Sequence, residues 1–228
     1  MAIALVVFDM AGTTVDDKDY VSEALGKGFS KFNYSITRDD ANYVMGIPKP
    51  VAIRTLLTEK FKVNDADGKL TGKIHEVFVE EMVAFYKTDP SVKSKKNAGQ
   101  VFRLLKEKGI LVAIDTGFSR VIADTIMERL QWKQQDFIDY SVTSDEVERG
   151  RPFPDMIFKA MKELKVASAD QVAKVGDTSS DLKQGTAAGC KFVIGITTGA
   201  YTREQLAKEK HTHLVDDLAE VVEIVTRY

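Results

Sequence analysis

Short, unbroken runs of aliphatic and aromatic residues recur along the chain, without the alternation of polar and apolar positions that marks a half-exposed strand. Such runs are typical of strands buried on both faces of a parallel sheet. The sequence predicts strands of this kind over residues 4–8, 110–114, 137–142, 171–175 and 192–196. Helical patterns separate and follow them, at residues 99–108, 120–130, 154–164, 181–188 and 217–225. This order predicts the α/β class, with a doubly wound parallel sheet.

One long stretch interrupts the alternation of strands and helices. Between residues 17 and 95 the sequence shows only helical patterns, for example over residues 20–32, 50–60 and 70–86. The chain has 228 residues, whereas a typical domain has roughly 150. We therefore expect an α/β core made of residues 1–16 and 96–228, with a small all-helical domain, residues 17–95, inserted after the first strand.

Composition narrows the class of protein without identifying it. The formal net charge is −2, and acidic and basic residues are mixed along the sequence, which argues against a nucleic-acid partner. Cys190 is the only cysteine, so neither an internal disulfide bond nor a cysteine-based zinc site is possible. The apolar run at residues 3–8 is far shorter than the roughly 20 residues that span a bilayer. We expect a cytoplasmic protein with no membrane partner.

Polar residues lie at or beyond the ends of four predicted strands, where open parallel sheets bind their ligands. They are Asp9, Thr116 with Gly117, Arg151 and Asp177. Each alone is equally explained as a turn or helix-capping residue. Together, Asp9 and Asp177 would repel each other without a cation, and carboxylates with a carbonyl and water suit Mg²⁺. A phosphoryl group fits such a site, with Thr116 and Arg151 on its oxygens and Asp9 as the nucleophile.

These residues and their spacing resemble the haloacid dehalogenase superfamily of phosphotransferases over essentially the whole chain. The matching segments are residues 9–14, 116–117, 151–152 and 176–181. The resemblance implies that the helical insertion is a mobile cap that closes over the site. It also implies that Asp9, the Ala11 carbonyl and Asp177 hold Mg²⁺ and that Thr13 contacts phosphate. Asp181 either supports the metal ligands or is simply an N-terminal residue of its helix.

Two positions narrow the resemblance to phosphonoacetaldehyde hydrolases, the phosphonatases. Ala11 stands where most superfamily phosphatases have an aspartate that protonates the leaving oxygen, and Arg151 stands where most have a lysine. Residues 45–49 resemble the segment that presents the phosphonatase Schiff-base lysine, and Lys49 falls on the matching position. Cleaving a C–P bond beside an aldehyde needs an electron sink on carbon, which a lysine imine supplies. The resemblance therefore implies C–P cleavage of a small phosphonoacetaldehyde-like substrate, with Asp9 and Lys49 as catalytic residues.

Three positions depart from the phosphonatase pattern and leave other functions open. Ala52, Phe118 and Asp19 stand where phosphonatases carry a histidine, a tyrosine and, close by, a cysteine. One alternative is a phosphatase of small phosphate esters, in which Lys49 only binds substrate. Lys49 is also explained as an ordinary surface lysine in a proline-rich loop. A non-catalytic binding module is a third hypothesis, and a homodimer formed through the cap is a further expectation from capped relatives.

Overall fold

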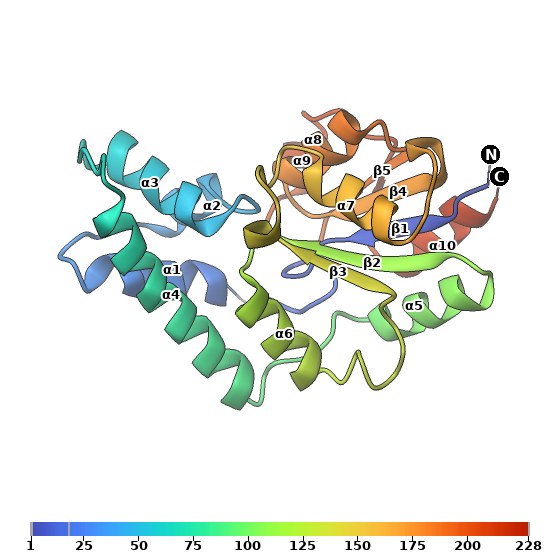
Figure 1. The fold of residues 1–228 in the computed structure, drawn as a ribbon, viewed down its shortest axis with the longest axis horizontal. Coiled ribbons are helices and arrows are strands. Elements are labelled where there is room, and N and C mark those ends of the chain that lie inside the picture. Colours follow the sequence, from blue (N-terminus) through green and yellow to red (C-terminus); the bar gives the residue numbers. More distant parts are fainter. Residues whose placement is uncertain (1, 18, 228) are drawn as a thin grey trace.

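A single parallel sheet forms the centre of the molecule in the computed structural model, which describes residues 2–17 and 19–227 (Figure 1). In this part of the chain the strand order is β3-β2-β1-β4-β5-β6, and every neighbouring pair is parallel. The predicted α/β class with a doubly wound parallel sheet is confirmed. The strands are β1 (Leu5–Phe8), β2 (Leu111–Thr116), β3 (Tyr140–Thr143), β4 (Val172–Gly176), β5 (Phe192–Ile196) and β6 (His213–Val215).

Helices cover both faces of the sheet, as the apolar character of the strands on both sides requires. One face carries α5 (Ala98–Glu107), α6 (Arg120–Arg129) and α10 (Ala219–Thr226); the other carries α7 (Asp155–Glu163) and α8 (Ser179–Ala188) (Figure 1). A short helix, α9 (Arg203–Leu206), precedes the edge strand β6. Two separate buried clusters follow from this layering, with Val6 and Phe8 in one cluster and Leu5 and Val7 in the other.

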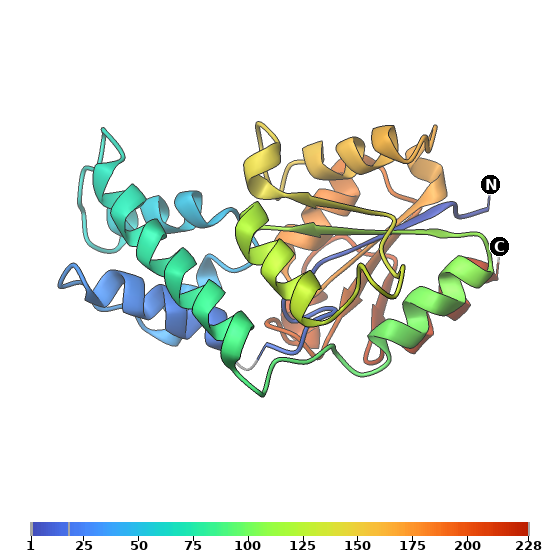
Figure 2. The ribbon, with the colours of Figure 1, turned by 60° about the horizontal axis from the view of Figure 1, so that its bottom comes forward.

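Four helices lie between β1 and α5 and form a separate lobe beside the sheet (Figures 1 and 2). They are α1 (Tyr20–Ser30), α2 (Arg38–Tyr43), α3 (Lys49–Glu59) and α4 (Lys69–Thr88). The sequence pattern predicts three of them. It misses the six-residue α2, which starts at a capping box in which Thr37 accepts from the Asp40 N–H and Asp40 accepts from the Thr37 N–H. The long helix α4 packs against α1 and α3 and also against α6 of the core.

Two short segments connect this lobe to the sheet, and they lie side by side. Val15 forms an isolated antiparallel bridge with Ser94. The Asp16 N–H donates to the Lys93 carbonyl at 3.0 Å, and the Lys95 N–H donates to the Thr14 carbonyl at 2.8 Å. The chain therefore enters and leaves the lobe next to the predicted boundaries, and the division into domains stays a prediction.

The central strands place the site. Strands β2, β1 and β4 are neighbours in the sheet, and their carboxyl ends meet at one edge, where the strand order reverses around β1. Ligands of open α/β sheets bind in the crevice at such a switch point. Among the described residues, no helix is long and apolar enough to cross a membrane.

Candidate active site

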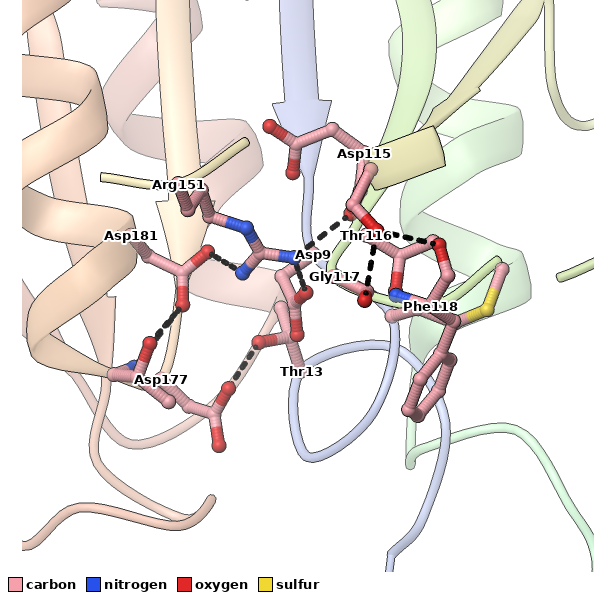
Figure 3. A network of polar contacts seen from close by, with 12 residues as sticks. Asp9, Thr13, Asp115, Thr116, Gly117, Phe118, Arg151, Asp177 and Asp181 are labelled. Atoms are coloured by element: carbon pink, nitrogen blue, oxygen red, sulfur yellow. Dashed lines mark hydrogen bonds and ion pairs between the residues drawn. The ribbon is translucent and has the colours of Figure 1, made fainter. Parts of the chain in front are cut away.

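Three carboxylates converge at the carboxyl edge of the central strands. Asp9 directly follows β1, Asp177 directly follows β4, and Asp181 lies in the first turn of α8. All three are buried, and each offers a carboxylate oxygen within 4.8 Å of the others (Figure 3). Neighbouring strand ends bring Asp9 and Asp177 together, and the short loop into α8 adds Asp181.

The environment of Asp9 and Asp177 disfavours two negative charges. Burial raises the pKa of Asp9 to about 6, although nearby Arg151 opposes the rise. Burial raises the pKa of Asp177 to about 8, and the neighbouring carboxylates Asp9 and Asp181 add to the effect. Buried oxygens that repel one another are the donor set that a hard divalent cation neutralises, so the residues fit Mg²⁺. Ala11 lies beside both carboxylates, since it lines one cavity with Asp9 and another with Asp177.

Arg151 joins two of these carboxylates. Its Nη2 donates to Asp9 Oδ1 at 2.6 Å, and its Nη1 donates to Asp181 Oδ1 at 2.5 Å (Figure 3). The guanidinium side chain is only 1% exposed. Burial works against its charge, but Asp181 and Asp9 outweigh burial, and the pKa of Arg151 is raised. A permanent cation therefore lies directly beside the Asp9 oxygens, where a phosphoryl group would arrive.

Thr116 is the last residue of β2, and Gly117 follows it directly. Both line the cavity that contains Asp9 and Arg151. The Thr116 hydroxyl oxygen accepts the Phe118 N–H at 3.2 Å, and Ser144 Oγ donates to the Gly117 carbonyl at 3.0 Å. These bonds fix the turn (Figure 3). Contact of Thr116 and Gly117 with a phosphoryl group stays a prediction.

Thr13 and Thr14 support the acidic residues through their hydroxyls. Thr13 Oγ1 donates to Asp177 Oδ1 at 2.9 Å, and Thr14 Oγ1 donates to the Asp9 carbonyl at 2.8 Å. In this arrangement the Thr13 proton serves a carboxylate, and its predicted contact with phosphate is untested. Asp181 is an N-terminal residue of its helix, as one of the two alternatives had it, and its support of the metal ligands stays a prediction. It completes the capping box of α8 with Thr178, and it also carries the ion pair with Arg151.

Lys49 lines the same cavity as Asp9. The cavity has a volume of about 20 Å³ and is lined by cap and core together, with Met45 and Lys49 facing Asp9 and Arg151. Lys49 is the first residue of α3, after Pro48 at the N-cap, and is only 3% exposed. Its Nζ lies 5.6 Å from the centre of the Phe118 ring. The interpretation of Lys49 as a surface lysine is therefore wrong, because the cap turns its amine toward the core.

The surroundings of Lys49 favour its neutral form. Burial lowers its pKa to about 8, and the positive charge of Arg151 adds to the lowering. Asp9 and Asp17 act in the opposite direction. A desolvated lysine next to another cation is the usual way in which proteins activate an amine as a nucleophile.

The cap segment that carries Lys49 fits against three loops of the core. A Cβ on Gly117 would lie 2.9 Å from the Ile47 carbonyl oxygen, and one on Gly150 would collide with Pro48 Cγ. Gly46, with φ +82°, leaves no room for a Cβ beside Thr178. The absence of side chains at these glycines lets the cap segment approach closely enough to seal the cavity.

One charged pair below the site is missed by the sequence reasoning. Lys174, in the middle of β4, and Asp115, near the end of β2, are fully buried and form an ion pair. Lys174 also lies 3.1 Å from Asp181 Oδ1. The available signal was a lysine inside an otherwise apolar predicted strand, because a lysine is almost never buried without a partner.

Comparisons with known proteins find matches over most or nearly all of the chain. A family profile described as "Haloacid dehalogenase-like hydrolase" matches residues 6–195. A phosphonoacetaldehyde hydrolase of Bacillus cereus strain G9842 is 33% identical over 99% of this chain and 87% of its own length. The phosphonoacetaldehyde hydrolase of Bacillus mycoides strain KBAB4 is 32% identical over the same shares.

Solved structures share the fold at lower sequence identity. A phosphonoacetaldehyde hydrolase like protein from Oleispira antarctica has a TM-score of 0.85 at 23% identity, covering 100% of this chain and 94% of its own. CbbY from Rhodobacter sphaeroides, in complex with phosphate, has a TM-score of 0.81 at 19% identity and covers 96% of both chains. At these identities the similarity concerns the fold alone.

Proposed function

Since this chain belongs to the haloacid dehalogenase-like hydrolase family, we propose that it cleaves the C–P bond of a small phosphonoacetaldehyde-like substrate. One observation carries the proposal: Asp9 and Lys49, which are far apart in the sequence, line one small cavity. A carboxylate attacks phosphorus and an amine condenses with an aldehyde, so the two nucleophiles suit the two ends of such a substrate.

Lys49 acts on the carbonyl end. Its neutral amine adds to the aldehyde and expels water, which gives an imine that is protonated on nitrogen. The neighbouring Arg151 and the burial that lower the pKa of Lys49 favour the attacking amine. The imine then receives the electron pair of the C–P bond, so no acid is needed at the leaving carbon. This agrees with an alanine at position 11, where most superfamily phosphatases have an aspartate.

Asp9 acts on phosphorus. Its carboxylate forms a bond to phosphorus as the C–P bond breaks, which leaves an aspartyl phosphate on Asp9 and an enamine on Lys49. Arg151, whose Nη2 already contacts Asp9, binds a phosphoryl oxygen during the transfer. Water then hydrolyses the aspartyl phosphate, and protonation and hydrolysis of the enamine release the aldehyde. The net reaction consumes one water and yields inorganic phosphate and the shortened aldehyde.

We further propose that Mg²⁺ is held by Asp9, Asp177 and the Ala11 carbonyl, with Asp181 nearby. When bound, the ion neutralises charge on the phosphoryl oxygens. Thr13 would keep its bond to Asp177 Oδ1 in this arrangement and orient that carboxylate toward the ion. A cytoplasmic location and a homodimer formed through the cap stay predictions.

The size of the closed cavity limits the organic part of the substrate. Its volume of about 20 Å³ holds little more than one water molecule. The cap must therefore open for substrate to enter, and a small carbon group is favoured once it closes. Val21, Met45 and Phe118 supply the apolar part of the lining.

A phosphate-release assay tests the proposal. Wild type should release phosphate from phosphonoacetaldehyde, and Lys49→Ala should lose at least about a hundredfold in kcat/KM, because the electron sink is gone. Lys73→Ala, at an exposed lysine of the same cap, is the matched control and should retain wild-type activity. Borohydride added with substrate should attach a covalent adduct to Lys49, located by peptide mass spectrometry.

The same assay separates the alternative. A phosphatase in which Lys49 only binds substrate would release phosphate from a small phosphate ester and not from phosphonoacetaldehyde. It would also keep its activity in Lys49→Arg, which retains the charge but forms no imine. Either result would replace C–P cleavage by ester hydrolysis as the function of this site.

A further inference from the structure

Lys174 lies on the same face of the sheet as Asp9, nearer the middle of its strand. In the register, Val7 pairs with both Ala113 of β2 and Lys174 of β4. Side chains alternate along a strand, so Asp9 and Asp115, two residues beyond Val7 and Ala113, lie on the same face as Lys174. This face is covered by α8, where a Cβ on Gly185 would lie 2.8 Å from Lys174 Cβ. The helix therefore rests directly on the lysine stem.

The charges around Lys174 alternate in sign up to the nucleophile. Lys174 Nζ pairs with the Asp115 carboxylate and with Asp181 Oδ1; Arg151 Nη1 pairs with the same Asp181 oxygen, and Arg151 Nη2 pairs with Asp9. We call the five residues Asp115, Lys174, Asp181, Arg151 and Asp9 the charge row. Every side chain in it is at most 7% exposed.

A substrate would disturb this row at one end only. An arriving phosphoryl group needs Arg151 Nη2, which at present donates to Asp9. Asp181 must hold the other side of the guanidinium while Nη2 changes partner. Lys174 supplies the opposing charge behind Asp181, and Thr178 fixes the second carboxylate oxygen by donating from Oγ1 to Asp181 Oδ2 at 2.6 Å. Without Lys174, Arg151 would be the only cation that neutralises the Asp181 carboxylate. Asp181 would then compete with the substrate for the Arg151 guanidinium.

We propose that Lys174 is a positioning residue that holds Asp181 and, through it, aims Arg151 at the phosphoryl group. Asp115 holds the Lys174 ammonium in place, because it pairs with the same Nζ that pairs with Asp181. The inference rests on the proposed function, because it assigns Arg151 to a phosphoryl oxygen. It adds a second buried cation that contacts no substrate and acts on binding from beneath the site.

The test measures phosphate binding separately from turnover. Inorganic phosphate is titrated calorimetrically into the protein with Mg²⁺, for wild type, Asp115→Asn and the double variant Lys174→Met with Asp115→Asn. The double change removes one charge of each sign, so the row keeps its charge balance where Lys174→Met alone would leave a carboxylate buried without its partner. Asp115→Asn is the matched control, because Lys174 keeps its pairing with Asp181.

We expect Asp115→Asn to bind phosphate within about threefold of wild type and the double variant to bind at least about tenfold more weakly, with KM raised more than kcat is lowered. The two variants should have similar Tm values in thermal unfolding. Equal phosphate affinity in the two variants would show that Lys174 is only structural. If wild type itself fails to bind phosphate with Mg²⁺, the proposed function fails and this inference fails with it.

Discussion

At the scale of single residues, Lys49 shows how position changes the chemistry of a side chain. With a pKa of about 8, about a tenth of the amine is neutral at pH 7, whereas the ordinary value of 10.5 leaves fewer than about one in a thousand. The cause is burial under the cap together with the positive charge of Arg151. Asp9 and Asp17 limit the lowering, so the amine remains largely protonated at neutral pH while the reactive fraction is substantial.

This pKa predicts the pH dependence of imine formation. Acetaldehyde with cyanoborohydride should alkylate Lys49 at a rate that rises about tenfold per pH unit below pH 8 and levels off above it, because only the neutral amine attacks. Peptide mass spectrometry measures the modified fraction at Lys49 and at the exposed control Lys73 in the same sample. A Lys49 profile that keeps rising to pH 10, as an ordinary lysine would, contradicts the prediction.

The residues of the site differ in how far the sequence revealed them. Asp9, Arg151 and Asp177 follow strands in an order that places them together once the sheet is parallel, so topology alone predicts their proximity. Lys49 comes from the helical lobe and not from a strand end, and only the resemblance of residues 45–49 indicated it. The ion pair of Lys174 was not predicted, because its partner, Asp115, lies on a different strand. Which residues pair across a sheet depends on strand order and register, and the sequence pattern does not show these.

At the scale of elements, the start of α3 positions Lys49, and the segment before it packs against the core loops. Pro48 precedes the helix and packs where Gly150 has no side chain, while the Ile47 carbonyl approaches Gly117. Helix α3 begins at Lys49 itself. The position of the Lys49 side chain therefore depends on how closely residues 46–48 pack against the core loops. A change of a single methyl group in the core loop should therefore act on an amine that belongs to the cap.

Gly150→Ala tests this dependence. The added Cβ would collide with Pro48 Cγ, and this should hold the cap segment away and lower kcat/KM for phosphonoacetaldehyde at least about tenfold. Gly72→Ala is the control, because nothing lies within 4 Å of a Cβ on that cap-helix glycine. It should leave activity unchanged and stabilise the protein by about 0.5–1 kcal/mol. Cyanoborohydride labelling of Lys49 reports its placement independently; undiminished labelling and activity in Gly150→Ala would refute the docking argument.

The sequence predicted the bounds of some elements closely and of others poorly. Predicted strand 192–196 is β5 at the same residues, whereas strand 137–142 begins only at Tyr140. Phe137 precedes the strand and packs as a side chain against Phe102, with 6.0 Å between ring centroids. An apolar run cannot distinguish such a packing residue from a paired one. The three-residue β6 and the six-residue α2 are too short to show a periodicity.

At the scale of the whole molecule, the burial of Asp9 and Asp177 couples the stability of the fold to the binding of the proposed metal ion. Asp9, Asp177 and Lys49 are all buried. Burial raises the pKa values of the two carboxyls far above their ordinary 3.8, so the metal-free fold favours their protonated forms. A divalent cation would relieve the same repulsion without protons, so we expect protons and the proposed Mg²⁺ to compete for these oxygens.

This competition predicts how stability changes with pH. Below about pH 4 the carboxyls of Asp9 and Asp177 are protonated in both the folded and the unfolded chain. As the pH rises from about 4 to about 8, the unfolded chain loses these two protons at lower pH than the folded chain does. The free energy of unfolding of the metal-free protein therefore falls over this range. Lys49 has no opposite effect until the pH exceeds about 8, and His75, whose pKa burial lowers, offsets part of the fall.

Mg²⁺ should recover the lost stability, and more of it at higher pH. At a concentration of about 100 times Kd the ion adds about 2.7 kcal/mol, which raises Tm by about 5–10 °C at pH 8 and much less at pH 5. Differential scanning calorimetry with and without Mg²⁺ measures both effects. Asp177→Asn is the control: it retains His75 and Lys49 but should lose the Mg²⁺ response and show a shallower decline with pH. The same Tm increase at pH 5 and pH 8 in wild type would mean that the ion does not bind at these carboxylates.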